Sequence, residues 1–240
     1  MTELSFSASG WRVVVAAGLL IALLAWETAQ PFFAPFGRAR DRARHGALNA
    51  SLVALVFAGA WLAVTAWAAT HRFGVLHRLE LSPWPRTALA VVLLDAWTYF
   101  WHRLNHSVPI FWRFHRLHHA DRAMDVTTAS RFHTGEIVLS SLLRMPVLLL
   151  LGCRIEELAL YELLLFAVAQ FHHANIAVPD RLDRWLRLLV VTPSLHKVHH
   201  SVVRAECDSN FSSLFSIWDR LFHTRRIVGD PRRIVFGIEQ

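Results

Sequence analysis

The sequence predicts an all-α integral membrane protein, a helical bundle of about four or five transmembrane helices with a histidine-rich helical cap. Composition is the first observation behind this prediction. Of the 240 residues, 54% are hydrophobic and 18% are charged, whereas soluble domains have about 45–50% apolar and about 25% charged residues. The second observation is that the apolar residues gather in long uncharged segments, as a bilayer requires. Both observations exclude a disordered chain and a fibrous repeat.

Charge and cysteine content narrow the class further. The net charge of +7 suits a membrane surface or a nucleic acid. Because the hydropathy favours lipid, we expect no nucleic-acid partner. Cys153 and Cys207 are the two cysteines, too few for a disulfide framework or a cysteine-based zinc site. Any bound metal must therefore be held by imidazole.

Five apolar segments are predicted to span the membrane: residues 11–29, 46–70, 87–101, 137–152 and 158–171. The clearest is 46–70, which contains 25 residues without a charge, because about 20 apolar residues cross the hydrocarbon core. The first segment is interpreted as a retained helix. No basic residue precedes Arg12 and no clear cleavage site follows, so a signal peptide is disfavoured.

The fourth and fifth segments are predicted to form a helical hairpin that turns near residues 153–157. Arg144 and Glu162 each lie roughly 13 Å from this turn at helical rise. An unpaired charge at that depth is costly, so we expect the two side chains to pair. The alternative is that one of them faces water or a substrate cavity.

Basic residues set the expected orientation of the bundle. Arg38, Arg40, Arg42 and Arg44 lie in the first loop, which places that loop and the C-terminal third in the cytoplasm. The basic loop 72–86 competes with this assignment. Residues 180–190 combine leucines and Trp185 at helical spacing with arginines on another face, which predicts a helix lying on the membrane surface. The alternative is a helix packed on a soluble core.

Histidines form three spaced clusters and one adjacent pair. HxxxH contains His102 and His106; two HxxHH clusters contain His115, His118 and His119, and His196, His199 and His200; His172 and His173 follow the fifth segment. Helical positions i, i+3 and i+4 share one face, so each cluster can point at one centre. Eight imidazoles exceed the needs of one four-coordinate zinc and suit two metal ions. Imidazole accepts zinc, copper, iron and nickel, so the metal stays open.

Several other residues are placed to support such ligands. Asp95 lies on the same helical stripe as His102 and His106, and we expect its carboxylate to accept a ring N–H from a ligating histidine. The alternative is a polar interface residue without a role. Asp208 and Asn210, just after the last cluster, are candidates for similar contacts. Thr192 and Pro193 predict the start of a helix carrying that cluster.

Residues 95–224 resemble the fatty acid hydroxylase / sterol desaturase superfamily of membrane-bound non-haem di-iron enzymes. The resemblance rests on an ordered series of motifs. These are DAWTYFWHRLNH at 95–106, FWRFHRLHH at 111–119, TASRFH at 128–133 with Glu136, HAN at 173–175, TPSLHKVHHS at 192–201, DSNF at 208–211 and WDRLF at 218–222.

The resemblance implies a set of metal ligands and supporting residues. The implied ligands are His102, His106, His115, His118, His119, His173, His196, His199 and His200. His133, Asn175, Asp95, Asp208 and Asn210 would support them. His172 stands where the family often has Gln and is expected not to be a ligand, and His223 stands where Gly is common.

The resemblance also implies the chemistry and the division of the chain. Residues 1–85 would form N-terminal membrane helices and basic loops, where substrate entry and specificity are expected. Residues 86–240 would form the hydroxylase-like domain. Two iron ions, O2 and electrons from an external ferredoxin or b-type cytochrome would oxidise a C–H bond of a lipid, sterol-like or other apolar substrate, by hydroxylation or desaturation. The arginines of 180–190 would dock this donor or meet lipid headgroups.

Two other classes of protein stay open at this point. One is a membrane protein that binds or transports metal without redox catalysis. The other is a catalytically silent scaffold that keeps the metal for folding. The histidine clusters all lie on the side assigned to the cytoplasm, whereas a transporter would space its ligands along a path through the bilayer.

Overall fold

The computed structural model describes residues 3–33 and 58–238, and within these ranges all regular secondary structure is helical. Only isolated β-bridges occur there, such as Pro31–Ile176 and Ser201–Phe236. The predicted span 46–70 is described from residue 58 onward; its first part lies outside the described residues.

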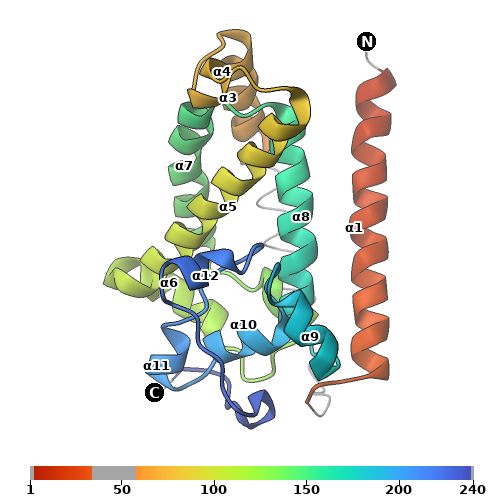
Figure 1. The fold of residues 1–240 in the computed structure, drawn as a ribbon, viewed down its shortest axis with the longest axis vertical. Coiled ribbons are helices and arrows are strands. Elements are labelled where there is room, and N and C mark those ends of the chain that lie inside the picture. The colour runs from red at the N-terminus through yellow and green to blue at the C-terminus, as the bar shows by residue number, and fades with distance from the viewer. Residues whose placement is uncertain (1–2, 34–57, 239–240) are drawn as a thin grey trace.

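Long helices and one short helix form one end of the molecule, and mostly short helices form the other (Figure 1). The longer helices are α1 (Glu3–Ala29), α3 (Ala58–Thr70), α5 (Pro83–Ser107), α6 (Pro109–His119), α7 (Thr134–Leu151) and α8 (Ile155–His173). The short ones are α4 (Val75–Arg78), α9 (Asp180–Leu186), α10 (Pro193–His199), α11 (Arg204–Cys207) and α12 (Ile217–Leu221), with 3-10 turns at Val126–Ser130 and Pro231–Arg233. In Figure 1, α6 and α9 to α12 gather below α5, α7 and α8, and α1 runs beside α8.

The core of the long-helix end lies between α4, α5, α7 and α8. Leu94 and Leu148 are fully buried there with Tyr161. Of the helices that the structure describes, α7 has both the length and the apolar composition of a membrane span; the apolar stretch of α1, Ala17–Ala29, is shorter.

The α7–α8 hairpin forms as the sequence predicts, with its turn at residues 152–154. Gly152 ends α7 with φ of 69° and packs against Gly74. A side chain at either position would collide with the other segment's backbone, so both require glycine. The buried Arg86 side chain closes this end by pairing its Nε with Glu157 Oε1 at 2.8 Å and donating to the Gly152 carbonyl.

The predicted pairing of Arg144 with Glu162 is confirmed. Arg144 Nη1 lies 2.5 Å from Glu162 Oε1, so the α7 and α8 charges neutralise each other across the hairpin. A second guanidinium nitrogen donates to Thr98 Oγ1 of α5 at 3.3 Å. One polar cluster therefore links α5, α7 and α8.

The amphipathic segment 180–190 forms α9 and the turn after it. Leu182, Trp185 and Leu189 are exposed, so this apolar face does not pack on the protein's own core. Asp183 is buried instead, and it accepts a hydrogen bond from Ser194 at the start of α10.

Candidate metal centre

Four helices bring the histidine clusters together at one end of the bundle. α5 carries His102 and His106 in its last turns. Pro109 then starts α6 immediately, since proline fits the first helical turn and disfavours helix at the residue before it. The chain changes direction between Ser107 and Pro109, and this places the HxxHH cluster of α6 against the end of α5. α8 ends at His173, and α10, which begins at Pro193 with Thr192 as its N-cap residue, carries the last cluster.

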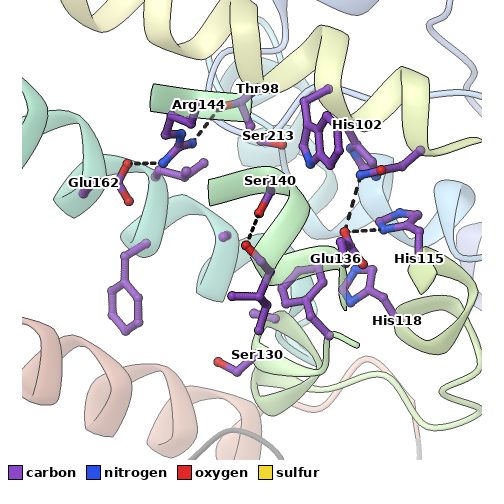
Figure 2. Close-up of a pocket in the computed structure, with 18 of the residues that line it drawn as sticks. Thr98, His102, His115, His118, Ser130, Glu136, Ser140, Arg144, Glu162 and Ser213 are labelled. Carbon is purple, nitrogen blue, oxygen red and sulfur yellow. Dashed lines mark hydrogen bonds and ion pairs between the residues drawn. The ribbon is translucent and has the colours of Figure 1, made fainter. Parts of the chain in front are cut away.

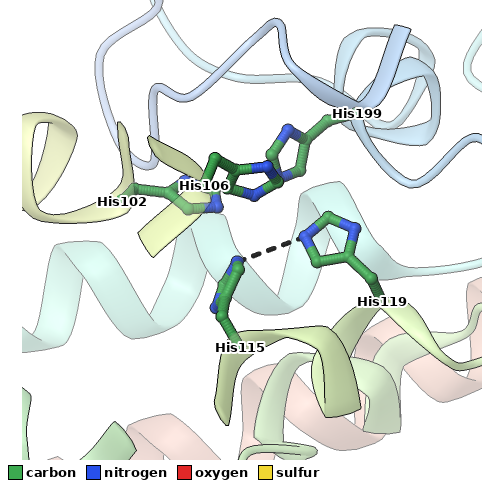
Figure 3. Close-up of side chains that lie close together, drawn as sticks. All are labelled: His102, His106, His115, His119 and His199. Atoms are coloured by element: carbon green, nitrogen blue, oxygen red, sulfur yellow. Dashed lines mark hydrogen bonds between the residues drawn. The ribbon is translucent and has the colours of Figure 1, made fainter. Parts of the chain in front are cut away.

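The nine histidines implied as ligands form two groups. The first contains His102, His106, His115, His119 and His199 (Figure 3), and the second contains His118, His173, His196 and His200. All nine are buried, and within each group the candidate ligand atoms lie within 4.8 Å of one another. Each HxxHH cluster therefore contributes to both groups. The prediction that each cluster points at one centre is wrong for these two, because the members of each cluster face different groups.

Outward hydrogen bonds fix the ring orientation in the first group. The Nδ1 atoms of His102 and His199 donate to the carbonyls of Phe211 and Ser209 at 2.8 and 2.7 Å. His115 Nδ1 donates to Glu136 Oε1 at 2.8 Å. With the proton on Nδ1, the Nε2 lone pair remains available as a metal ligand.

Several inward nitrogens of this group have no protein partner. The Nε2 atoms of His102, His106 and His199 are buried without a hydrogen bond among the described residues. A buried polar atom without a partner is costly. A bound metal ion would remove that cost, so these orphaned atoms fit a metal site.

Spacing between nitrogens in the second group leads to the same conclusion. His173 Nε2 lies 3.0 Å from the Nε2 atoms of both His118 and His196, and His196 Nε2 lies 3.2 Å from that of His200. Two nitrogens bound to one ion at about 2.1 Å, with an angle of about 90–110°, are about 3.0–3.4 Å apart. The four rings are therefore close to the spacing that a shared ion requires.

Burial keeps these rings in the form that binds metal. The pKa values of His118, His119, His196, His199 and His200 are lowered well below 6.5, first by desolvation and then by neighbouring imidazoles. Neutral imidazole is the ligand form. The donor set fits two transition-metal ions, and its all-nitrogen chemistry leaves zinc, copper, iron and nickel open.

Of the expected supporting residues, Asp208 contacts a ring and Asp95 does not. Asp208 Oδ1 lies 3.2 Å from His106 Nδ1. Asp95 instead accepts hydrogen bonds from the Leu214 and Phe215 backbone and from Trp218 Nε1. The prediction of an Asp95–histidine contact is therefore wrong. Asp95 faces the segment around residues 214–218, and the donors of that segment, rather than a histidine ring, bind its carboxylate.

The other three expected supports also bind backbone rather than rings. His133 Nδ1 accepts from Gly135 N at the start of α7. The Asn175 side chain donates to and accepts from the Phe33 backbone. Asn210, with φ of 52°, donates to the Leu195 carbonyl and accepts from Arg226 N. They hold the segments that carry the ligands.

Sequence reasoning missed the role of Glu136 as the acceptor for His115. The sequence does show Glu136 as an acidic residue in the first turn of an apolar helix. An acidic residue at that position usually stabilises the helix dipole, so it does not by itself indicate a contact with a histidine. The sequence also did not indicate that the Phe211 and Ser209 carbonyls accept hydrogen bonds from His102 and His199. Every residue has a backbone carbonyl, so the residue type does not show which carbonyl is used.

The two remaining unusual histidines have clear environments. His172 is buried, with its ring centroid 3.9 Å from that of His196, but it belongs to neither group. His223 has φ of 57°, a left-handed conformation that glycine adopts without strain. This explains why glycine suits the position.

A cavity of about 520 Å³ adjoins the histidines. His102, His115 and His118 line one end of it, and Arg144 and Glu162 line the other (Figure 2). Trp61, Trp97 and Leu165 are among the apolar residues that line it. The cavity can therefore hold an elongated, largely apolar molecule with one end at the histidines.

Comparison with known proteins places these features in a family. The fatty acid hydroxylase family model matches residues 87–224. An ornithine lipid hydroxylase from Rhizobium tropici is 32% identical over 158 residues, which cover 65% of this chain and 47% of that protein. Human alkylglycerol monooxygenase is 31% identical over 165 residues, covering 68% and 36% of the two chains.

A third relative is more distant. Human cholesterol 25-hydroxylase is 24% identical over 146 residues, covering 60% of this chain and 52% of that protein. The chain thus spans about half or less of the length of these curated relatives. No solved structure matches it.

Proposed function

The chain belongs to the fatty acid hydroxylase family, and we propose that it hydroxylates or desaturates an unactivated C–H bond of a lipid, sterol-like or other apolar substrate. The names of its relatives support a lipid substrate, since they are an ornithine lipid hydroxylase, an alkylglycerol monooxygenase and a cholesterol 25-hydroxylase. In this proposal the reaction consumes O2.

One observation carries this proposal: two groups of buried imidazoles face an apolar cavity. We propose that each group holds one iron ion. Iron bound there would supply the activation of O2 and the oxidation of the C–H bond, with electrons from an external donor.

The protein's own residues would keep this site rigid and dry. Glu136 and Asp208 hold the rings of His115 and His106 from outside, which fixes their tautomer and orientation. The Phe211 and Ser209 carbonyls do the same for His102 and His199. The apolar wall of the cavity excludes water and leaves room for the substrate chain beside the imidazoles.

The proposed setting is a membrane. Residues 1–85 would supply membrane helices and basic loops, and residues 86–240 would form the hydroxylase domain, in a bundle of four or five spans. The metal site would lie on the cytoplasmic side. The exposed apolar face of α9 would then rest in the interface, and its arginines would meet headgroups or an acidic ferredoxin or b-type cytochrome.

Metal binding or transport without redox catalysis remains the competing function. The histidines of both groups are carried by α6, α10 and the last turns of α5 and α8, which lie toward one end of the bundle (Figure 1). Transport would need ligands along a path between the two sides. The grouping therefore favours the oxygenase.

Metal analysis of the detergent-purified protein, with lipid profiling of cells with and without it, tests the proposal. We expect about two irons per chain and a lipid changed by one oxygen or two hydrogens. His118→Ala and His199→Ala each remove a ligand from a different group and should lower metal content and activity together. His223→Gly removes an exposed histidine outside both groups and is the control. A redox-inactive metal after anaerobic iron loading, with an unchanged lipid profile, would exclude the oxygenase.

A further inference from the structure

The Arg144–Glu162 ion pair lines the cavity at the end away from the histidines (Figure 2). Arg144 lies eight residues beyond Glu136 on α7, about 12 Å along the helix, and Glu162 lies eleven residues before His173 on α8, about 16 Å. The cavity thus has a polar end and a histidine end about 12–16 Å apart. An ion pair that is partly removed from water costs desolvation energy and is weak evidence of a stabilising role.

The pair keeps hydrogen-bonding capacity that its internal contacts do not use. One guanidinium nitrogen of Arg144 bonds to Glu162 and another to Thr98. Trp61 stacks on the guanidinium with its ring centroid 4.8 Å away. The Glu162 side chain is 36% exposed, and no other described residue donates to its second oxygen. An acceptor and a donor from a ligand therefore have a place here.

The opposite charges of Arg144 and Glu162 disfavour a headgroup that carries only one sign of charge. An anionic headgroup would meet the Glu162 carboxylate, and a cationic headgroup would meet the Arg144 guanidinium, so each would be repelled by one member of the pair. A hydroxyl group both accepts from guanidinium and donates to carboxylate. It satisfies both members at once.

We propose that Arg144 and Glu162 bind the hydroxyl end of a neutral, single-hydroxyl amphiphile and thereby position a carbon 12–16 Å from that hydroxyl at the histidines. This inference rests on the proposed function for the reaction, but the binding of the hydroxyl is independent of turnover. In the proposed membrane arrangement, Arg144 lies about two helical turns from the α7–α8 turn, a depth at which ionisable residues mark substrate paths.

Binding of probes with equal chain length tests the headgroup. The probes are a long-chain primary alcohol, its methyl ether and the corresponding carboxylate, measured on the full chain in detergent. Hydrogen bonds to charged groups predict that the alcohol binds at least about tenfold more tightly than the methyl ether. The double variant Arg144→Leu/Glu162→Leu should lose this preference. The control Arg233→Leu/Asp230→Asn removes an exposed ion pair of the C-terminal 3-10 turn and should keep it.

Glu162→Gln tests the charge argument without changing side-chain volume. It leaves Arg144 uncompensated, so the preference between alcohol and carboxylate should shift by about tenfold toward the carboxylate. A pair that only holds the helices together would show no such shift. Equal binding of alcohol and methyl ether by the unmodified protein, or an unchanged ratio in Glu162→Gln, would overturn the proposal.

The position of oxidation gives a second readout. With alcohols of increasing length, the oxidised carbon should stay at a fixed distance from the hydroxyl. A fixed distance from the methyl end would overturn the inference and leave the oxygenase function intact. Headgroup selectivity without oxidation of any probe would support the inference and count against the proposed function.

Discussion

Removing the Glu136 carboxylate should weaken one of the two metal sites and spare the other. Glu136 Oε1 accepts a hydrogen bond from His115 Nδ1 at 2.8 Å, and the Glu136 side chain is 7% exposed. His115 belongs only to the five-histidine group. Loss of such a partner costs 10–100-fold in metal affinity, about 1.4–2.8 kcal/mol. We expect Glu136→Leu to lower metal affinity by about 100-fold. Glu136→Gln should lower it by about tenfold, because the amide oxygen can still accept the hydrogen bond from His115.

Asp208 provides an internal comparison for the same effect. It contacts His106 at 3.2 Å, its side chain is 37% exposed, and it also pairs with Arg204 at 2.5 Å. Water screens an exposed contact, so Asp208→Asn should cost about fivefold or less. The exposed Glu80→Gln serves as the control.

Chelator competition with Co²⁺ or Fe²⁺, following two binding phases, measures these affinities. In Glu136→Leu one phase should weaken and the other should stay unchanged. The reasoning would be refuted by equal weakening of both phases, by no change, or by a larger effect of Asp208→Asn than of Glu136→Leu.

Further predictions concern stability. Asp95→Ala leaves one buried and two partly buried donors without their acceptor and should destabilise the protein by about 3 kcal/mol, seen as a lower unfolding temperature; Asp95→Asn should lose less. His223→Gly should stabilise it by about 1 kcal/mol in denaturant unfolding, because the left-handed backbone strains a non-glycine residue. The buried histidines, such as His118 and His199, have pKa values lowered from 6.5, so the unfolded chain binds more protons below that pH. The metal-free protein should therefore lose stability as pH falls from 6.5 to 5.5. Chelation of the metal should lower the unfolding temperature at pH 7.5, and re-addition should restore it.

Periodicity was enough to predict the helices around the site. The hairpin of α7 and α8, the Arg144–Glu162 pair and the start of α10 at Pro193 follow from apolar runs, charge depth and capping. Spacing also predicted which histidines share a face. It did not predict that each HxxHH cluster divides between two groups, because that depends on how α6, α8 and α10 cross.

Contacts outside the histidines were harder to predict because many of them are made by backbone. The sequence places Asp95 on the helical stripe of His102 and His106, but it does not tell which donors reach the carboxylate. Asn175 and Asn210 likewise bind main-chain groups of distant segments. A side-chain pattern contains no information about which carbonyl or N–H group a loop presents.

The C-terminal loop connects Asp95 to the histidines indirectly. Asp95 accepts from the backbone N–H groups of Leu214 and Phe215, and the buried Asp219 accepts from that of Phe211 at 2.7 Å. The carbonyl of Phe211 in turn accepts from His102. The carboxylates of Asp95 and Asp219 thus bind backbone N–H groups of residues 211–215. A backbone carbonyl of the same loop orients the His102 ring. Asp95 therefore positions His102 through this loop, so Asp95→Asn should loosen metal binding only as far as it loosens the loop, whereas Glu136 acts on its ring directly.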